Sequence, residues 1–140
     1  MKRARSADEL ALLRLHEQDR RAHLEGDAEL LTSAMADQVW ESSRGALTLL
    51  SRAELRDRFA AYFAQVRYTA WDDLGPAHVV VSEDGQSGWM AVAIDARLAG
   101  PDPDDHVRER AFESSWIATY AKVDGRWLIT GIASSVVARS

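Results

Sequence analysis

Apolar residues recur with a helical period in the first half of the chain and with a strand period in the second half. Residues 7–25 contain neither Pro nor Gly and are rich in Leu, Ala, Glu and Arg, which is typical of a long helix. Ser6 is a suitable N-cap for this helix, and Gly26 ends it. Asp27 can cap a shorter helix over residues 28–36, so the two elements form a predicted helical hairpin.

Two strand pieces and a third helix follow. Residues 39–43 and 46–50 have strand composition on either side of a turn. Ser51 and Glu54 then have the spacing of a capping box. Apolar side chains recur at helical spacing after them, which predicts a helix over residues 52–66.

The rest of the chain has the pattern of strands joined by hairpins. Stretches rich in β-branched and aromatic residues cover residues 66–74, 77–84, 88–98, 107–123 and 126–138. Turn dipeptides separate them, among them Asp84-Gly85 and Asp124-Gly125. The stretch GPDPDD at residues 100–105 is predicted to be a loop with solvated acids. Helices followed by hairpin-linked strands predict an α+β fold, with the helices packed in a strongly curved, antiparallel or mixed sheet.

Length and composition predict one domain over residues 1–140, because 46% of the residues are hydrophobic. The net charge of −5 argues against nucleic acid or an anionic membrane as the partner. The one basic cluster lies in residues 1–6, which we expect to form a flexible tail. No run approaches 18 apolar residues and the chain has no Cys, so we expect a cytoplasmic protein without membrane helices, disulfides or thiolate metal sites.

Several segments, in this order and spacing, resemble the nuclear transport factor 2-like domains, also called SnoaL-like or DUF4440-type cone domains. They are EGD at 25–27, MADQVWESSRG with LLSRAEL at 35–55, VVVSEDGQSGW at 79–89 and YAKVDGRWLI at 120–129. The resemblance implies a curved sheet wrapped around helices, an apolar cavity open at one end, and a homodimer packed through the sheet. Members include isomerases, polyketide cyclases, epoxide hydrolases and dehydratases as well as non-catalytic domains, so the fold does not fix the function.

The last strand is one expected wall of that cavity. Strict alternation places Trp127, Ile129, Gly131 and Ala133 on one face. Many relatives carry histidine at the places that Gly131 and Ala133 match here. Either these small residues widen the pocket and leave this wall without an imidazole that could carry a proton, or Gly131 allows a bend or bulge in the sheet.

The first helix carries the strongest candidate chemistry. His16, Asp19 and His23 are spaced three and four apart and therefore share one side of the helix. A carboxylate between two imidazoles in an apolar pocket could act as a general base, and the same spacing could hold a divalent metal. A second apolar stripe begins at Leu10 and continues through Leu13 and Leu24. If this stripe is the one that packs on the sheet, the three polar residues face the solvent.

Residues 39–43, VWESS, resemble the strand that carries the proton-shuttling aspartate in steroid isomerases of this fold. Ser42 stands at the place of that aspartate, and alternation turns Glu41 to the other face. The two oxyanion donors of the isomerase match Asp19 and approximately Ile117. An ionised Asp19 repels an enolate and Ile117 donates no hydrogen bond, so we do not expect steroid isomerisation by that mechanism.

Aromatic residues are dense on the predicted strands. Phe112, Ser114, Trp116 and Tyr120 share one strand face, which lines a broad pocket if it is concave and forms a dimer interface if it is convex. The expected substrate-binding residues are Trp40, Ser42, Tyr62, Trp71, Trp89, Ser114, Trp116 and Tyr120.

Two functions compete at this point. The first is a pocket for a small apolar or polycyclic molecule, with cofactor-independent isomerase, cyclase or dehydratase chemistry in which Asp19 is the base and His16 or His23 its partner. No metal or cofactor is expected. The alternative is a non-catalytic homodimerisation or ligand-carrier domain, since no complete catalytic set is present.

Overall fold

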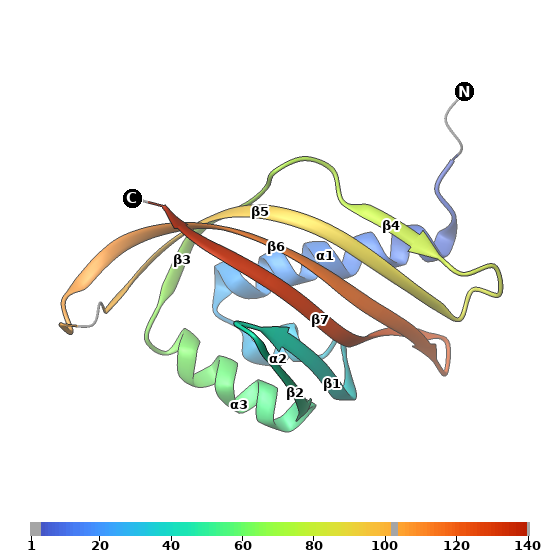
Figure 1. The fold of residues 1–140 in the computed structure, drawn as a ribbon, viewed down its shortest axis with the longest axis horizontal. Helices are drawn as coiled ribbons and strands as arrows, with labels where there is room; N and C mark the ends of the chain where they lie inside the picture. Colours follow the sequence, from blue (N-terminus) through green and yellow to red (C-terminus); the bar gives the residue numbers. More distant parts are fainter. Residues whose placement is uncertain (1–3, 102–103, 140) are drawn as a thin grey trace.

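The computed structural model describes residues 4–101 and 104–139, and within them helices and a hairpin come first and long strands afterwards (Figure 1). The helices are α1 (Ala7–Glu25), α2 (Ala28–Thr32) and α3 (Arg52–Phe63). The strands are β1 (Met35–Ser43), β2 (Ala46–Ser51), β3 (Arg67–Asp73), β4 (His78–Val81), β5 (Ser87–Pro101), β6 (Val107–Val123) and β7 (Arg126–Arg139). No helix in the described residues is long and apolar enough to cross a membrane.

Local sequence signals set the ends of the helices. Ser6 and Glu9 form a complete capping box at the start of α1, and Ser51 and Glu54 form another at α3. Gly26 ends α1 at a φ of 66°, a left-handed conformation that glycine adopts without a steric penalty. These predicted boundaries are confirmed; of the predicted basic tail, residues 1–3 lie outside the described residues.

The strands form one mixed sheet in the order β2-β1-β7-β6-β5-β3, with β4 paired to β5 beside β3. All neighbours are antiparallel except β1 and β7, which run parallel. The long strands β5, β6 and β7 arch over α1, and α3 lies below the β1–β2 hairpin (Figure 1). The predicted α+β class with a curved sheet around helices is confirmed.

Some boundaries differ from the prediction. The second helix was expected over residues 28–36, yet α2 ends at Thr32, because Met35 pairs with Ile129 of β7 and buries its side chain in the core. The third helix ends at Phe63 instead of residue 66.

The predicted loop at residues 100–105 begins later than expected. Gly100 and Pro101 belong to β5, where Gly100 pairs with Arg108 of β6. A Cβ on Gly100 would lie 2.8 Å from Cγ1 of Val66, so glycine allows β5 to continue past the end of α3. Residues 102–103 of this stretch lie outside the described residues.

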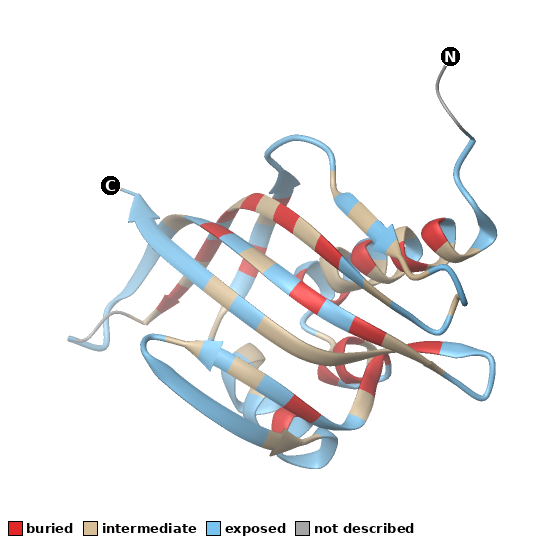
Figure 2. Cartoon of the chain, turned by 45° about the vertical axis from the view of Figure 1, so that its right-hand side comes forward, coloured by how far each residue is buried: buried red, intermediate tan, exposed pale blue. Residues whose placement is uncertain are grey.

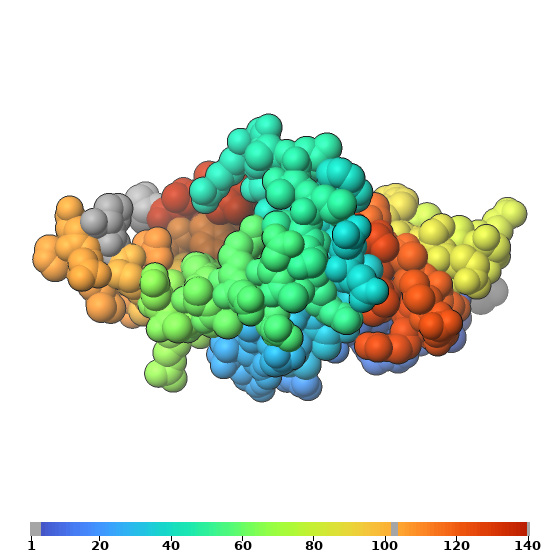
Figure 3. Space-filling view, turned by 90° about the horizontal axis from the view of Figure 1, so that it is seen from below, coloured from blue at the N-terminus to red at the C-terminus, as the bar shows by residue number. Residues whose placement is uncertain are grey.

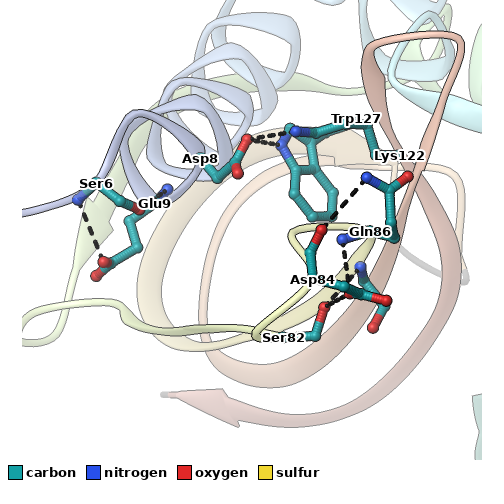
Figure 4. Close-up of polar contacts among 9 residues, drawn as sticks. Ser6, Asp8, Glu9, Ser82, Asp84, Gln86, Lys122 and Trp127 are labelled. Carbon is teal, nitrogen blue, oxygen red and sulfur yellow. Dashed lines mark hydrogen bonds and ion pairs between the residues drawn. The ribbon is translucent and has the colours of Figure 1, made fainter.

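One cluster of buried core residues lies at the end of the sheet where α1 begins. Leu12 and Met90 are almost completely buried there, beside Tyr120 and Trp127 (Figure 2). Asp8 closes this end, because its Oδ1 accepts a hydrogen bond from Nε1 of Trp127 at 2.9 Å and lies 2.8 Å from Nζ of Lys122 (Figure 4). We call this end, with Asp8, Leu12, Lys122 and Trp127, the closed end.

Candidate functional site

A cavity of about 600 Å³ lies between the concave face of the sheet and helices α1 and α3. Ligand pockets in proteins have volumes of about 300–1,000 Å³, so the space suits a small molecule. Seen from below, α3 and the β1–β2 hairpin cover part of the sheet, and β6 and β7 are visible between them (Figure 3). Of the residues expected at the site, those that line this cavity are His16, Asp19, His23, Tyr62, Trp71, Ser114, Trp116 and Tyr120.

Helix α1 turns its polar stripe inward. His16 is 6% exposed and His23 is 9% exposed, whereas Leu10 and Leu24 of the competing stripe are about 40% exposed or more. The question that the sequence left open is therefore answered: the face with the two histidines and Asp19 packs toward the sheet. The acid is thereby held among aromatic side chains of β3 and β6.

Asp19 is a buried acid of the cavity whose hydrogen-bonding capacity is only partly satisfied. Its Oδ2 is buried and has no hydrogen-bond partner among the described residues. Its Oδ1 lies 3.6 Å from Nδ1 of His23, beyond a short hydrogen bond. Burial raises the pKa of the Asp19 carboxyl above its ordinary value, and the nearby imidazoles of His23 and His16 offset part of this effect. The carboxyl is thus tuned toward the protonated form and lacks the partners that a purely structural acid has.

His23 is held in a single orientation. Its ring stacks on Trp71, with the centroids 3.8 Å apart and an interplanar angle of 17°, and its edge meets Phe63 and Tyr68. Nδ1 donates a hydrogen bond to the backbone carbonyl of Asp19 at 2.8 Å. Because that carbonyl only accepts, Nδ1 carries the proton and Nε2 is the nitrogen left for a ligand.

His16 connects the cavity wall to the outer surface. Its Nε2 lies 2.7 Å from Oδ1 of Asp73, a carboxylate at the end of β3 whose side chain is 38% exposed. Its ring also packs near Trp116, at a centroid distance of 6.1 Å. The expected pairing of His16 with Asp19 is therefore replaced by a His16–Asp73 pair, which fixes the tautomer of the imidazole.

Hydroxyl groups are the other polar features of the cavity. The hydroxyls of Tyr62 and Tyr68 lie 2.7 Å apart and share a hydrogen bond. Burial raises the pKa of Tyr68, and burial together with the charge of Asp19 raises the pKa of Tyr120. Both phenols are therefore neutral hydrogen-bonding groups. Trp71 also has a buried Nε1 without a partner among the described residues, so the aromatic wall has an unused donor.

The prediction is wrong for Trp40, Ser42 and Trp89, which do not line this cavity. Strand alternation turns them to the convex side of the sheet, where Trp40 is 51% exposed and Trp89 is 39% exposed. Glu41, between Trp40 and Ser42, faces the cavity, as does Met35 at the start of β1. The resemblance to steroid isomerases thus placed Ser42 at the cavity and Glu41 on the other face, and the structure has the reverse. Ile117, the approximate match to the second oxyanion donor, is exposed as well.

The expectation of strict alternation on β7 is also wrong. The pairing of β6 with β7 shifts register between Thr119 and Tyr120, which is a bulge in β7 beside Gly131. Beyond it the residues of β7 at the cavity are Ile132, Ser134, Val136 and Ala138, not Gly131 and Ala133. Thr130 is the extra residue of the bulge, and Gly131 follows it at a place where a Cβ would lie 2.9 Å from Oγ1 of Thr119.

Three charged residues at the cavity were not predicted. Glu41 accepts two hydrogen bonds from the guanidinium of Arg58 on α3, one of them at 3.1 Å. Arg44 in the β1–β2 turn and Arg110 on β6 also line the cavity. Alternation back from Phe112 could have identified Arg110, whereas no sequence signal marked Arg44.

No group of three or more His, Asp or Glu side chains in residues 4–101 and 104–139 is arranged to hold a metal ion. The stripe of His16, Asp19 and His23 fails because one imidazole turns to Asp73 and the other to a backbone carbonyl. The geometry instead places a buried carboxyl of raised pKa, that of Asp19, inside an aromatic cavity. The binding and catalytic roles of these residues stay predictions.

Solved structures share this fold over nearly their whole length. A conserved protein from Planctomyces limnophilus has a TM-score of 0.77 at 18% identity, covering 96% of this chain and 100% of that chain. A ketosteroid isomerase-like protein from Erwinia carotovora atroseptica has a TM-score of 0.72 at 13% identity, covering 96% of this chain and 100% of that chain. A cystatin-like protein from Nostoc punctiforme has a TM-score of 0.68 at 14% identity, with 97% and 96% covered. No protein-family model and no curated protein sequence matches the chain, so the similarity is one of fold.

Proposed function

We propose that this chain, which has the cone fold of the nuclear transport factor 2-like superfamily, binds a small ring-bearing apolar molecule in its cavity and exchanges a proton with it through Asp19. The observation that carries the proposal is the buried, unpartnered Oδ2 of Asp19 in a cavity of about 600 Å³. A buried polar atom without a partner costs about 1–3 kcal/mol of stability, and such a cost is typical of functional sites.

The shape and lining of the cavity support a flat, largely apolar ligand. Trp71 packs against Phe112 and Trp116, at centroid distances of 6.5 and 6.0 Å, and all three rings line the cavity. Aromatic faces and edges favour stacked or edge-on contacts with a ring. Ser114 and the tyrosine pair supply a small number of hydrogen-bonding groups, the combination found in small-molecule sites.

The chemistry that fits this site is proton transfer within one molecule. A carboxyl whose pKa is raised by burial can take a proton from one atom of a ligand and return it to another, as in an isomerisation, a cyclisation or an elimination. Such a transfer needs no oxidant and no cofactor. Nε2 of His23, held by the stack on Trp71, is placed to receive a hydrogen bond from the ligand.

A fluorescence titration tests the binding. Neutral ring compounds ranging in size from indane to a steroid are added to the protein while tryptophan emission is followed. We expect saturable quenching that is weakened in Trp116→Phe, at the cavity, and unchanged in Trp40→Phe, on the convex face. A panel in which no compound gives saturable quenching would contradict the proposal.

A catalytic role for Asp19 is tested separately. For any compound that the protein both binds and converts, Asp19→Asn is expected to remove turnover while the compound still binds. Turnover at the wild-type rate in this variant would contradict the assignment.

A ligand carrier is the second candidate function. The observation that favours it is that His16 is paired with Asp73 and the cavity carboxylate Glu41 with Arg58, so neither is free to assist Asp19 in a reaction. Saturable binding without conversion of any bound compound would support a carrier, whereas conversion would exclude it.

We also propose that the convex face of the sheet forms a homodimer. Exposed apolar side chains gather there in matching register, namely Trp40, Leu47, Leu49, Trp89, Ile117 and Val137. Large exposed apolar patches on a sheet mark interaction sites. Light scattering should give twice the mass of 15.6 kDa for the wild type and the monomer mass for Ile117→Glu; a monomeric wild type would overturn the proposal.

A further inference from the structure

The rim of the cavity carries positive charge on two elements. Arg44 lies in the turn between β1 and β2 and has a φ of 53°, next to Gly45 at 80°. Arg110 lies on β6, one step beyond Phe112 in the row of residues that faces inward. Both guanidiniums belong to exposed residues that line the same cavity, so each can reach a group that enters it.

These two guanidiniums are not neutralised by the protein. Neither Arg44 nor Arg110 has a hydrogen-bond or ion-pair partner in the part of the chain that the structure describes. Glu41, which lines the cavity together with the buried Asp19, is already paired with Arg58. The rim is therefore cationic, although the chain as a whole carries 22 acidic and 17 basic side chains.

Polarity changes from the rim to the interior. Arg110 lines the same cavity as the hydrogen-bonded Tyr62–Tyr68 pair, and its positive charge acts to lower the pKa of Tyr68 against the larger effect of burial. Inward of this pair the walls are aromatic, with Trp71 and Trp116. Burial raises the pKa of Asp19, so the interior repels an anion less than a carboxylate of ordinary pKa in the same place would.

We infer that the ligand of this cavity is an aromatic or alicyclic carboxylic acid, whose ring packs on Trp71 and Trp116 while its carboxylate is bound at the rim by Arg44 and Arg110. Guanidinium groups bind carboxylates through paired, charge-assisted hydrogen bonds, and they do so better than lysine because their donors are fixed in a plane. The inference rests on the proposed function and adds the charge and orientation of the ligand to it.

Calorimetric titration with two compounds of the same shape tests the inference. The probes are 2-naphthoate and its neutral counterpart 2-naphthamide, added to the wild type and to the variants Arg44→Gln, Arg110→Gln and Arg97→Gln. Arg97 is the matched control, since it is an exposed arginine on β5 that does not line the cavity.

We expect the wild type to bind 2-naphthoate at least about tenfold more tightly than 2-naphthamide, in line with a charge-assisted hydrogen bond. Arg44→Gln and Arg110→Gln should each weaken naphthoate binding by about five- to fiftyfold and leave naphthamide binding unchanged, while Arg97→Gln changes neither. Equal binding of both compounds by all variants would overturn the inference and leave the proposed apolar pocket standing. Failure of both compounds to bind, together with a flat fluorescence titration, would overturn both.

Discussion

Asp8 and Asp19 lie on the same helix, three turns apart, and their surroundings are opposite. At the closed end Asp8 is paired with Lys122 and Trp127, and these hydrogen bonds lower the pKa of its carboxyl (Figure 4). At the cavity Asp19 has a buried oxygen without a partner, and burial raises its pKa. One acid is used to hold the fold together, and the other is kept at a cost to stability that the proposed role in ligand binding would explain.

The same contrast holds for two tryptophans. Nε1 of Trp127 donates to Asp8, whereas the buried Nε1 of Trp71 has no acceptor among the described residues. Leu12 fills the space at the closed end, while a cavity remains beside Trp71. Under the proposed function, stability and ligand binding are therefore divided between the two ends of one curved sheet.

The largest expected effect is on the packing of the closed end. Leu12 is completely buried, so Leu12→Ala should lower the free energy of unfolding by about 2–5 kcal/mol through lost burial and a residual void. Leu10, which is 43% exposed on the same helix, is the matched control, and Leu10→Ala should change stability by less than about 0.5 kcal/mol. Urea denaturation measures both; equal losses would show that the closed end is no better packed than the helix surface.

At the cavity the sign of the effect should reverse. Asp19→Leu removes a buried acid without a full set of partners and should raise the free energy of unfolding by about 1–3 kcal/mol at neutral pH. Asp19→Asn keeps a polar group in the same place and serves as the control for side-chain size. A marked loss of stability in Asp19→Leu would mean that Asp19, like Asp8, is a structural acid.

A smaller effect is expected at the Trp127–Asp8 hydrogen bond. Trp127→Phe keeps an aromatic ring but removes the Nε1 donor, so the melting temperature should fall by a few degrees. Trp40→Phe, on the convex face, has no such bond to lose and should melt like the wild type at concentrations that keep the proteins in the same oligomeric state. Equal melting temperatures for the wild type, Trp127→Phe and Trp40→Phe would show that the Trp127–Asp8 hydrogen bond does not stabilise the protein.

The smallest effect is in the pH dependence, where the two acids should again differ in sign. Asp8 has a lowered pKa, so its contribution to stability is present above the ordinary value of 3.8 and is lost as the pH falls through the folded value. Asp19 has a raised pKa, so its contribution is complete below 3.8 and is lost as the pH rises through the folded value.

Urea denaturation from pH 3 to pH 7 should therefore show two opposite trends. The stability deficit of Asp8→Asn should shrink toward acid pH, whereas the stability advantage of Asp19→Asn over the wild type should grow toward neutral pH. If the stability differences of the two variants from the wild type changed with pH in the same direction, the proposed contrast between Asp8 and Asp19 would be wrong.

Much of the fold could be predicted because it depends on local signals. The capping residues Ser6 and Ser51, the helix stop at Gly26 and the turn at Asp124-Gly125 each determine the backbone of a few neighbouring residues. The face of β6 with Phe112 and Trp116 was also identified, and the structure decides between its two readings, because that face is concave.

The parts of the site that could not be predicted depend on contacts between distant segments. The bulge beside Gly131 shifts the parity of β7, so Ser134 faces the cavity where alternation placed Ala133. Asp73 binds His16 across 57 positions of sequence and takes it away from Asp19. Alternation correctly placed Glu41 and Ser42 on opposite faces of the strand. It could not tell which face is concave, because that is set by the curvature of the whole sheet.

The most direct test of the account follows the side-chain carboxyl carbons of Asp8 and Asp19 by NMR during a pH titration, first in the free protein and then with 2-naphthoate or a neutral ring compound that binds. The account predicts that Asp8 titrates below 3.8 and Asp19 above it, and that only the signal and pKa of Asp19 change when the compound is added. If Asp19 titrates at 3.8 or lower and its signal does not respond to any bound compound, the proposed site is wrong.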